Sequence, residues 1–233
     1  MSAIDARGLT RFFGVYAALR NVTFTVPPGQ CVALLGRNGA GKTTLLRLVA
    51  GIHAPSEGTL EVFGGDPGKP STRKAIGFLG HGSGLYDELS AEENLMLAAR
   101  VYGLPDPATE TRRWLERVDL DRLARSRPGE FSRGMRQRLA LARVLLAQPK
   151  LLLLDEPLTA LDDRASRMVR ELLEDACRAG TTLLMSTHHL SEGMEIASHI
   201  LLLDRGRVAY SGERTAAMLA NPAAVYELCG DAA

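Results

Sequence analysis

Cysteine is scarce in this sequence, which has 233 residues and only three cysteines, Cys31, Cys177 and Cys229. The three are far apart and odd in number, which argues against a disulfide framework and against a cysteine-rich metal site. Cys31 lies in an apolar stretch, so we expect it to be a packing residue in the core.

Long apolar runs are also missing. No segment approaches the roughly 20 apolar residues that a helix needs to span a bilayer, and the first residues do not combine a charged start with an apolar core. We therefore expect a cytoplasmic chain that does not insert into the membrane, so any membrane role depends on a partner.

An excess of charge of either sign is absent as well. The sequence has 28 basic and 27 acidic residues, a formal net charge of +1. This balance gives no electrostatic reason to expect a nucleic acid or an anionic membrane surface as partner. With 45% hydrophobic and 24% charged residues, the composition is that of an ordinary globular protein.

What the sequence does contain is a glycine-rich loop between an apolar stretch (30–35) and a helical pattern (42–50). Residues 36–43 read G-x-x-x-x-G-K-T, the spacing of a phosphate-binding loop. Glycines let backbone N–H groups close around phosphate oxygens, Lys42 adds a positive charge, and the Thr43 hydroxyl can bind Mg²⁺. The residues expected to contact the nucleotide here are Gly36, Asn38, Gly39, Ala40, Gly41, Lys42, Thr43 and Thr44.

Two adjacent carboxylates, Asp155 and Glu156, follow an apolar run at 151–154 that predicts a buried strand. Catalysis of phosphoryl transfer to water consists mainly of positioning and charge stabilisation. Asp155 can hold Mg²⁺ and Glu156 can polarise the attacking water, while Lys42 and His188 can stabilise the transferred group. The loop and the carboxylates together predict a site that binds and hydrolyses Mg-ATP.

Strand and helix patterns at 1–83 and 147–233 predict an α/β core of the P-loop type, with an antiparallel β edge near its N-terminus. Residues from about 84 to 146 change character, because a capping box at Ser90 opens a first helical pattern and two more follow. We interpret this stretch as a helical subdomain inserted into a single domain spanning 1–233.

The sequence FSRGMRQR at 131–138, which begins with the motif FSRGM, stands immediately before an apolar helical pattern at 139–146. Ser132 and Gly134 at a helix N-terminus can form an anion site, although a plain N-cap role for Ser132 is the alternative. Because this motif precedes Asp155 and Glu156 by a short stretch, the chain resembles the ABC ATPase family, whose signature usually reads LSGGQ.

The resemblance covers nearly the whole chain and implies further roles. Phe13 matches the aromatic residue that stacks on adenine, with core packing of Phe13, or Tyr16 in its place, as alternatives. Asp155 and Glu156 match the family's Mg-associated aspartate and catalytic glutamate. His188 matches the switch histidine at the γ-phosphate, and a structural strand-end histidine is the alternative.

The resemblance also implies partners. The loop 159–162, which includes Asp162, matches the segment that crosses to a second subunit. With one phosphate loop and one signature per chain, two copies are expected to pair head to tail, each ATP lying between Lys42 of one copy and Ser132 and Gly134 of the other. Such a homodimer would power a separate integral membrane permease from the inner face of the membrane.

One departure from the family pattern follows the predicted strand at 75–79. Where the family usually has a Gln that reports the γ-phosphate to the permease, this chain has His81, which we expect at the Mg²⁺ site with Thr43 and Asp155 and in coupling to the permease. The stretches 79–95 and 131–143 resemble the haem exporter ATPases of cytochrome c maturation (CcmA-type), although other exporters share the second stretch. We expect haem export, and another exporter of drugs, lipids or polysaccharides is the alternative.

A non-hydrolysing regulatory subunit is the alternative from a different class of protein. Such a subunit would be expected to lack Glu156 or His188, and both residues are present. Measured ATP turnover of the purified chain would separate the two hypotheses.

Overall fold

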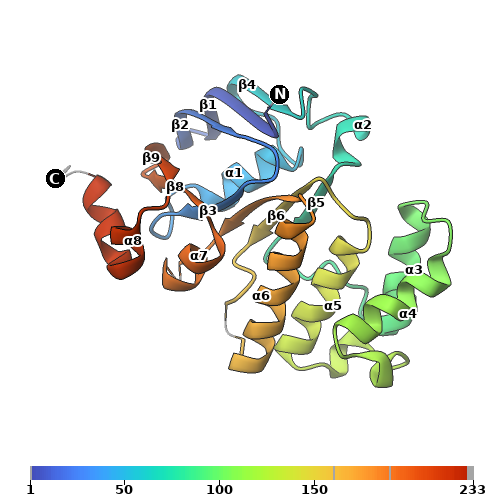
Figure 1. The fold of residues 1–233 in the computed structure, drawn as a ribbon. Helices are drawn as coiled ribbons and strands as arrows, with labels where there is room; N and C mark the ends of the chain where they lie inside the picture. Colours follow the sequence, from blue (N-terminus) through green and yellow to red (C-terminus); the bar gives the residue numbers. More distant parts are fainter. Residues whose placement is uncertain (1, 160, 189, 230–233) are drawn as a thin grey trace.

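Two β-sheets of different kinds lie at the centre of the protein, seen here in a computed structural model (Figure 1). The smaller sheet is antiparallel, with strand order β2-β1-β4. It consists of β1 (Ile4–Phe13), β2 (Tyr16–Val26) and β4 (Glu57–Val62). The predicted antiparallel edge is therefore a separate three-stranded sheet. The structure describes residues 2–159, 161–188 and 190–229.

The larger sheet is mostly parallel, with strand order β5-β6-β7-β3-β8-β9. Its last strand, β9, runs antiparallel to β8. Every residue of β3, β6 and β7 is buried, which fits the mainly apolar sequences of these three strands. Because these three strands are parallel, their carboxyl ends meet at one edge of the sheet, where ligands bind in open α/β folds. The strands are β3 (Cys31–Leu35), β5 (Ile76–Leu79), β6 (Leu151–Asp155), β7 (Thr182–Ser186), β8 (His199–Asp204) and β9 (Arg207–Glu213).

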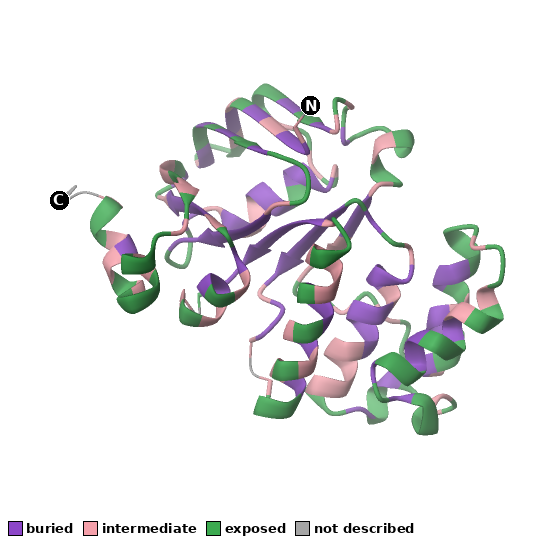
Figure 2. Cartoon of the chain, in the orientation of Figure 1, coloured by how far each residue is buried: buried purple, intermediate pink, exposed green. Residues whose placement is uncertain are grey.

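Helices cover the large sheet on both sides. The first, α1 (Lys42–Val49), contacts β2 of the small sheet and β6 and β7 of the large one, so it lies between the two sheets (Figure 1). On the other side of the large sheet, α6 (Asp163–Arg178) packs beside α7 (Leu190–Ile196), which contacts β3. Their buried faces form the core with the strands, and their outer faces are exposed (Figure 2).

The chain between β5 and β6 is helical, as the sequence predicts. Ser90 and Glu93 form the predicted capping box, since the Ser90 hydroxyl accepts from the Glu93 N–H at 3.2 Å and the Glu93 carboxylate accepts from the Ser90 N–H at 2.7 Å. The division at 84 and 146 stays a prediction. The elements are α3 (Ala91–Val101), α4 (Pro107–Arg117), the short 3-10 helices η1 (Asp121–Leu123) and η2 (Pro128–Glu130), and α5 (Arg133–Leu145).

Short helices that the sequence analysis did not predict precede β5 and follow β9. They are α2 (Pro70–Arg73), α8 (Ala216–Ala220) and η3 (Pro222–Cys229). From η3, Val225 is buried in the same cluster as Leu35 at the end of β3. Across the described residues, no helix combines the length and apolar character that crossing a membrane requires.

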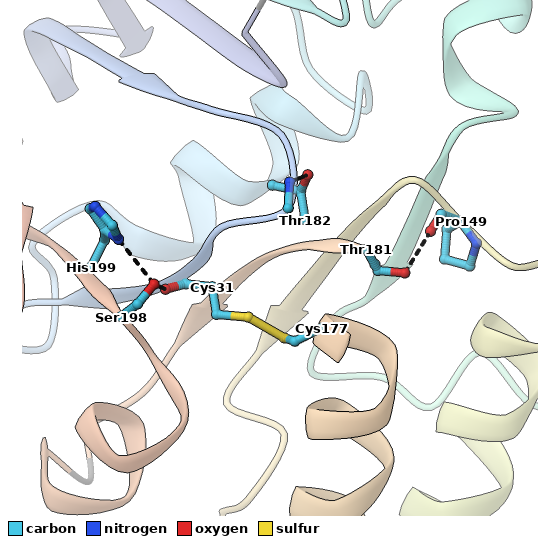
Figure 3. The surroundings of a disulfide bond; sticks show 8 residues. Cys31, Pro149, Cys177, Thr181, Thr182, Ser198 and His199 are labelled. Carbon is cyan, nitrogen blue, oxygen red and sulfur yellow. Dashed lines mark hydrogen bonds between the residues drawn. A yellow bond between two sulfur atoms is a disulfide. The ribbon is translucent and has the colours of Figure 1, made fainter. Parts of the chain in front are cut away.

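The expectation that cysteines form no disulfide is wrong. Cys31, at the start of β3, is bonded to Cys177, in the last turn of α6, with the two Cα atoms 6.6 Å apart (Figure 3). Cys31 is also buried in the core, as expected. Distance along the chain misled the prediction, because 146 residues separate two positions that the fold brings together.

Candidate nucleotide site

The glycine-rich loop between β3 and α1 depends on backbone conformations that favour glycine. Gly36 has φ 149°, and a Cβ atom at this position would lie 2.4 Å from the carbonyl oxygen of Leu203. Gly41, directly before α1, has φ 104° and is similarly crowded. Both positions therefore exclude side chains, and the loop leads directly into the N-terminus of α1, where unpaired N–H groups attract anions.

The Lys42 side chain is buried and bends back over the loop. Its ammonium group donates hydrogen bonds to the carbonyl oxygens of Gly36 at 2.8 Å and Arg37 at 3.3 Å. Burial lowers the pKa of Lys42, while the nearby carboxylates of Glu156 and Asp155 act in the opposite direction. Phosphate oxygens would offer this ammonium group stronger acceptors than the two carbonyls.

Asp155 ends β6 and is only 4% exposed. One carboxylate oxygen accepts a hydrogen bond from the Thr43 hydroxyl at 2.8 Å, and the other accepts from the Ser186 hydroxyl at 2.6 Å. The structure thus brings together Thr43 and Asp155, which were predicted separately. Ser186 was missed by the sequence analysis, although its place at the end of an apolar strand directly before Thr187 and His188 was an available signal.

Glu156 follows Asp155 in the left-handed region, with φ 55°, which is uncommon for a residue other than glycine. Its N–H group donates to both the carbonyl and the hydroxyl oxygen of Ser186, each at 3.1 Å. Its carboxylate lies 3.1 Å from Nδ1 of His188 and accepts from the Thr159 hydroxyl at 3.3 Å. A carboxylate held in this way can orient and activate a water molecule.

His81 lies at the same end of the site. Its Nε2 atom is 3.4 Å from a carboxylate oxygen of Asp155, and its side chain is 59% exposed. The fold therefore places the residue that departs from the family pattern directly beside the buried aspartate.

A cleft of about 380 Å³ opens above the phosphate loop. Phe13 and Tyr16, on either side of the β1–β2 turn, both contribute to its wall and are 45% and 57% exposed. Core packing of Phe13 is therefore wrong, whereas Tyr16 remains an alternative for stacking on adenine. The cleft is lined by Phe13, Tyr16, Ala18, Asn38, Gly39, Gly41, Lys42, Thr43, Thr44, His81 and Glu156.

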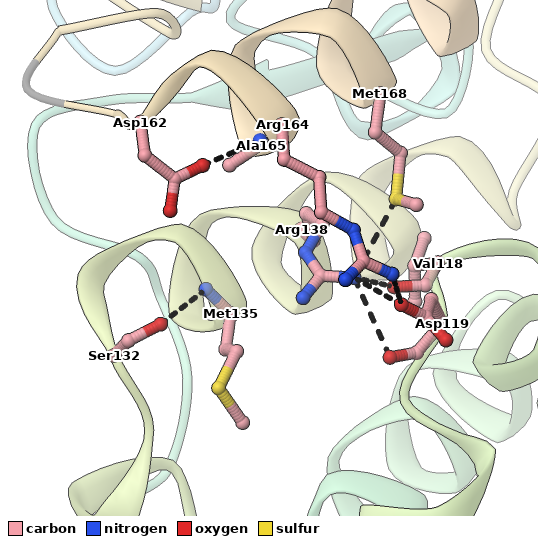
Figure 4. A network of polar contacts seen from close by, with 9 residues as sticks. All are labelled: Val118, Asp119, Ser132, Met135, Arg138, Asp162, Arg164, Ala165 and Met168. Carbon is pink, nitrogen blue, oxygen red and sulfur yellow. Dashed lines mark hydrogen bonds and ion pairs between the residues drawn. The ribbon is translucent and has the colours of Figure 1, made fainter.

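The FSRGM motif lies at the start of α5, outside the group of residues that line this cleft. Ser132 is the N-cap, and its hydroxyl accepts from the Met135 N–H at 3.3 Å (Figure 4). A Cβ atom on Gly134 would lie 2.9 Å from the Cβ of Ala165, so close packing against α6 also requires this glycine. Gln137, which the sequence analysis did not single out, donates to the carbonyl of Pro157 at 2.9 Å.

Asp162 caps the N-terminus of α6, since its carboxylate accepts from the Ala165 N–H at 2.7 Å (Figure 4). Thr159, in the same loop, contacts Glu156 as described above. Ala160, which belongs to the predicted crossing loop, lies outside the described residues.

A phosphate loop, a buried aspartate, a glutamate and a histidine at one edge of a parallel sheet define a P-loop protein that hydrolyses nucleoside triphosphates. The family model for the ABC transporter matches residues 19–159. The chain therefore belongs to the ABC transporter family, as an ATP-binding domain with ATPase activity.

Individual proteins agree with this assignment. The chain is 38% identical over 203 residues to the ABC transporter ATP-binding protein NatA of Bacillus subtilis, covering 85% of this chain and 82% of that protein. It is 36% identical over 219 residues to the Nod factor export ATP-binding protein I of Cupriavidus metallidurans, covering 91% and 72%. A dimeric ATP-binding cassette in a post-hydrolysis state with ADP and Pi is similar in structure, with a TM-score of 0.83, 25% identity and coverage of 91% and 99%.

Proposed function

We propose that this chain works as a head-to-tail homodimer in which each ATP lies between Lys42 of one copy and Ser132 and Gly134 of the other. The observation that carries the proposal is the separation of two anion sites within one chain. The residues that line the cleft above the phosphate loop do not include Ser132, which caps a different helix, α5. The dimeric form of a structurally similar cassette supports pairing of the same kind.

In this proposal the chain's own residues divide the chemistry. Thr43 and Asp155 fit a Mg²⁺ ion, because Mg²⁺ is commonly held by few protein oxygens together with substrate phosphates, and the Thr43 hydroxyl and the Asp155 carboxylate already meet at 2.8 Å. When bound, the ion neutralises charge on the phosphates. Glu156 orients the attacking water, and Lys42 and His188 stabilise charge on the transferred phosphoryl group.

The dimer binds a separate membrane permease. It does so from the cytoplasm, at the inner face of the membrane. Exposed apolar side chains on the helical part of the chain, Tyr86, Leu97, Val101 and Tyr102, offer a surface for such a protein. His81 connects this part to the nucleotide site, since it contacts Asp155 and the loop that follows it leads to α3. We therefore assign His81 to coupling between the nucleotide and the permease.

The cargo we propose is haem, handled for cytochrome c biogenesis. The support is the resemblance of residues 79–95, including His81, to the haem exporter ATPases. Relatives include both a Nod factor export protein and a sulfate/thiosulfate import protein, so their similarity does not select the cargo, and the second candidate is an exporter of drugs, lipids or polysaccharides. Identifying the membrane protein that co-purifies with the tagged chain decides between them, since a permease of another exporter class contradicts haem.

Substitution of Ser132 by Arg tests the shared site. We expect Ser132→Arg to leave ATP binding by the monomer nearly unchanged, because Lys42 and Thr43 belong to the other half of the site. The bulky cation should block ATP-dependent dimerisation, measured by size-exclusion chromatography, and with it turnover. Normal dimerisation and hydrolysis in this variant would show that Ser132 does not contact ATP across the interface.

A further inference from the structure

A network of polar contacts at Asp119 joins the end of α4 to the beginnings of α5 and α6 (Figure 4). Arg138, one helical turn beyond the FSRGM motif, donates from Nη1 to the carbonyl oxygen of Val118 and to that of Asp119 at 3.4 Å. The same Nη1 atom lies 3.8 Å from the Asp119 carboxylate. Arg164, in the first turn of α6, donates to this carboxylate at 2.7 Å. Asp119 thus holds one arginine from each of the two helices.

Asp119 is placed for this contact by an unusual backbone conformation. Its φ angle is 55°, and it follows Val118, which ends α4. Aspartate and asparagine tolerate this left-handed region better than most residues. The turn directs both the carbonyl and the carboxylate of Asp119 toward Arg138.

Arg138 is largely withdrawn from water, because its side chain is only 13% exposed. Burial lowers the pKa of Arg138, and the charge of Asp119 partly offsets this effect. A buried guanidinium needs its acceptors, since leaving it without them is costly. In addition, its Nη1 atom contacts the sulfur of Met168 on α6 at 3.5 Å.

The two helix starts joined by this network carry the residues assigned to the dimer interface. Ser132 caps α5 and Asp162 caps α6. The close approach of Gly134 to Ala165 and the Gln137 to Pro157 hydrogen bond bring the same regions together at other points. The spacing of the two helix starts is therefore held on several sides.

We propose that Asp119 is a positioning residue that, through Arg138 and Arg164, presents Ser132 and Asp162 to the second copy as one rigid surface. This inference rests on the proposed head-to-tail dimer. In the proposed dimer Asp119 touches neither ATP nor the second copy. Its effect is on dimer closure and not on nucleotide binding by a single chain.

The test compares variants in a Glu156→Gln background, where ATP hydrolysis does not disturb the dimer equilibrium. Asp119→Asn keeps the size of the side chain and tolerates the backbone conformation, so the fold should survive. We expect it to raise the dissociation constant of the ATP-bound dimer. Each of the two altered copies should contribute a factor of about two to five, the effect of losing an exposed ion pair. Arg138→Lys, whose shorter side chain withdraws the donor from the acceptors that Nη1 of Arg138 contacts, should weaken dimerisation at least about ten-fold.

Two readouts separate positioning from a general loss of stability. The dissociation constant for ATP of the monomer should stay unchanged in Asp119→Asn, and Arg164→Gln should add little to Asp119→Asn if both act through one network. Glu110→Gln is the matched control, because it removes an ion pair to Arg113 at 3.0 Å that stays within α4. This control should dimerise like the parent protein.

The inference is overturned if Asp119→Asn leaves the dissociation constant of the dimer unchanged. It is also overturned if Asp119→Asn weakens ATP binding by the monomer as much as it weakens dimerisation. Failure of the proposed function gives a different result. If Ser132→Arg also dimerises normally, the head-to-tail dimer itself is wrong. If Ser132→Arg blocks dimerisation while Asp119→Asn and Arg138→Lys leave the dissociation constant of the dimer unchanged, the positioning role alone is rejected.

Discussion

The backbone of Glu156 is in the left-handed region, and its carboxylate contacts both His188 and Thr159. These contacts hold the carboxylate in place. We expect Glu156→Gln to keep ATP affinity and to lower turnover by about 10²- to 10⁴-fold, because the amide keeps the size but cannot accept a proton. ATP-bound dimer should accumulate. Binding and steady-state hydrolysis measured side by side check this, with exposed Glu57→Gln as control. Turnover like that of the wild type would remove Glu156 from the mechanism.

Ser186 gives a second prediction for a single residue. Its hydroxyl donates to buried Asp155 at 2.6 Å and accepts from the Glu156 N–H at 3.1 Å. Ser186→Ala should destabilise the protein by about 1–3 kcal/mol, because a buried carboxylate loses a donor, and should lower turnover more than ATP affinity. Thermal unfolding and kinetics test this, with exposed Ser71→Ala as the comparison. A variant with normal turnover would reduce Ser186 to a packing role.

Individual site residues were predictable from sequence where their chemistry depends on a fixed local spacing. Lys42 and Thr43 were found through the G-x-x-x-x-G-K-T pattern, and Asp155 and Glu156 through their place after an apolar run. Ser186 was not found, because its contact with Asp155 depends on the register of β6 and β7. Sequence periodicity predicts that strands exist but not which residues lie opposite each other.

Among secondary-structure elements, the parallel strands and long helices were predicted because their apolar periodicity is strong. The fully buried β6 reads as four consecutive leucines before Asp155, and the capping box at Ser90 marks the start of α3. The short helices α2, α8 and η3 have too few turns to show a period. Pairing of β1, β2 and β4 into a sheet of their own depends on contacts across the chain that no local pattern contains.

The bond between Cys31 and Cys177 leads to a prediction about β3 and α6, which it joins. A disulfide that closes a long loop stabilises a protein by about 2–4 kcal/mol, chiefly by restricting the unfolded chain. The unfolding midpoint should therefore fall when a thiol reductant is added, and Cys177→Ser should remove this sensitivity. Cys229→Ser, which leaves the bonded pair intact, is the control. If the unfolding midpoint of the wild-type protein is the same with and without reductant, the bond has no stabilising role.

At the scale of the whole molecule, the head-to-tail arrangement makes a prediction that no single variant can test. In such a dimer each site takes its phosphate loop from one copy and its Ser132 from the other. A Lys42→Met chain and a Ser132→Arg chain should each be nearly inactive alone. In a mixed dimer, however, the intact loop of the Ser132→Arg chain faces the intact Ser132 of the Lys42→Met chain, so one site of the two is complete.

Mixing the two inactive proteins should therefore restore ATP turnover. The restored rate should be highest near equal amounts of the two chains and reach at most about half of the wild-type rate, because each mixed dimer has one complete site of two. Mixing Lys42→Met with Glu156→Gln is the control, because both changes lie in the same half-site and no mixed dimer has a complete one. Restoration in the first mixture and not in the second requires that two chains share each ATP, and no restoration in either would argue for sites built within one chain.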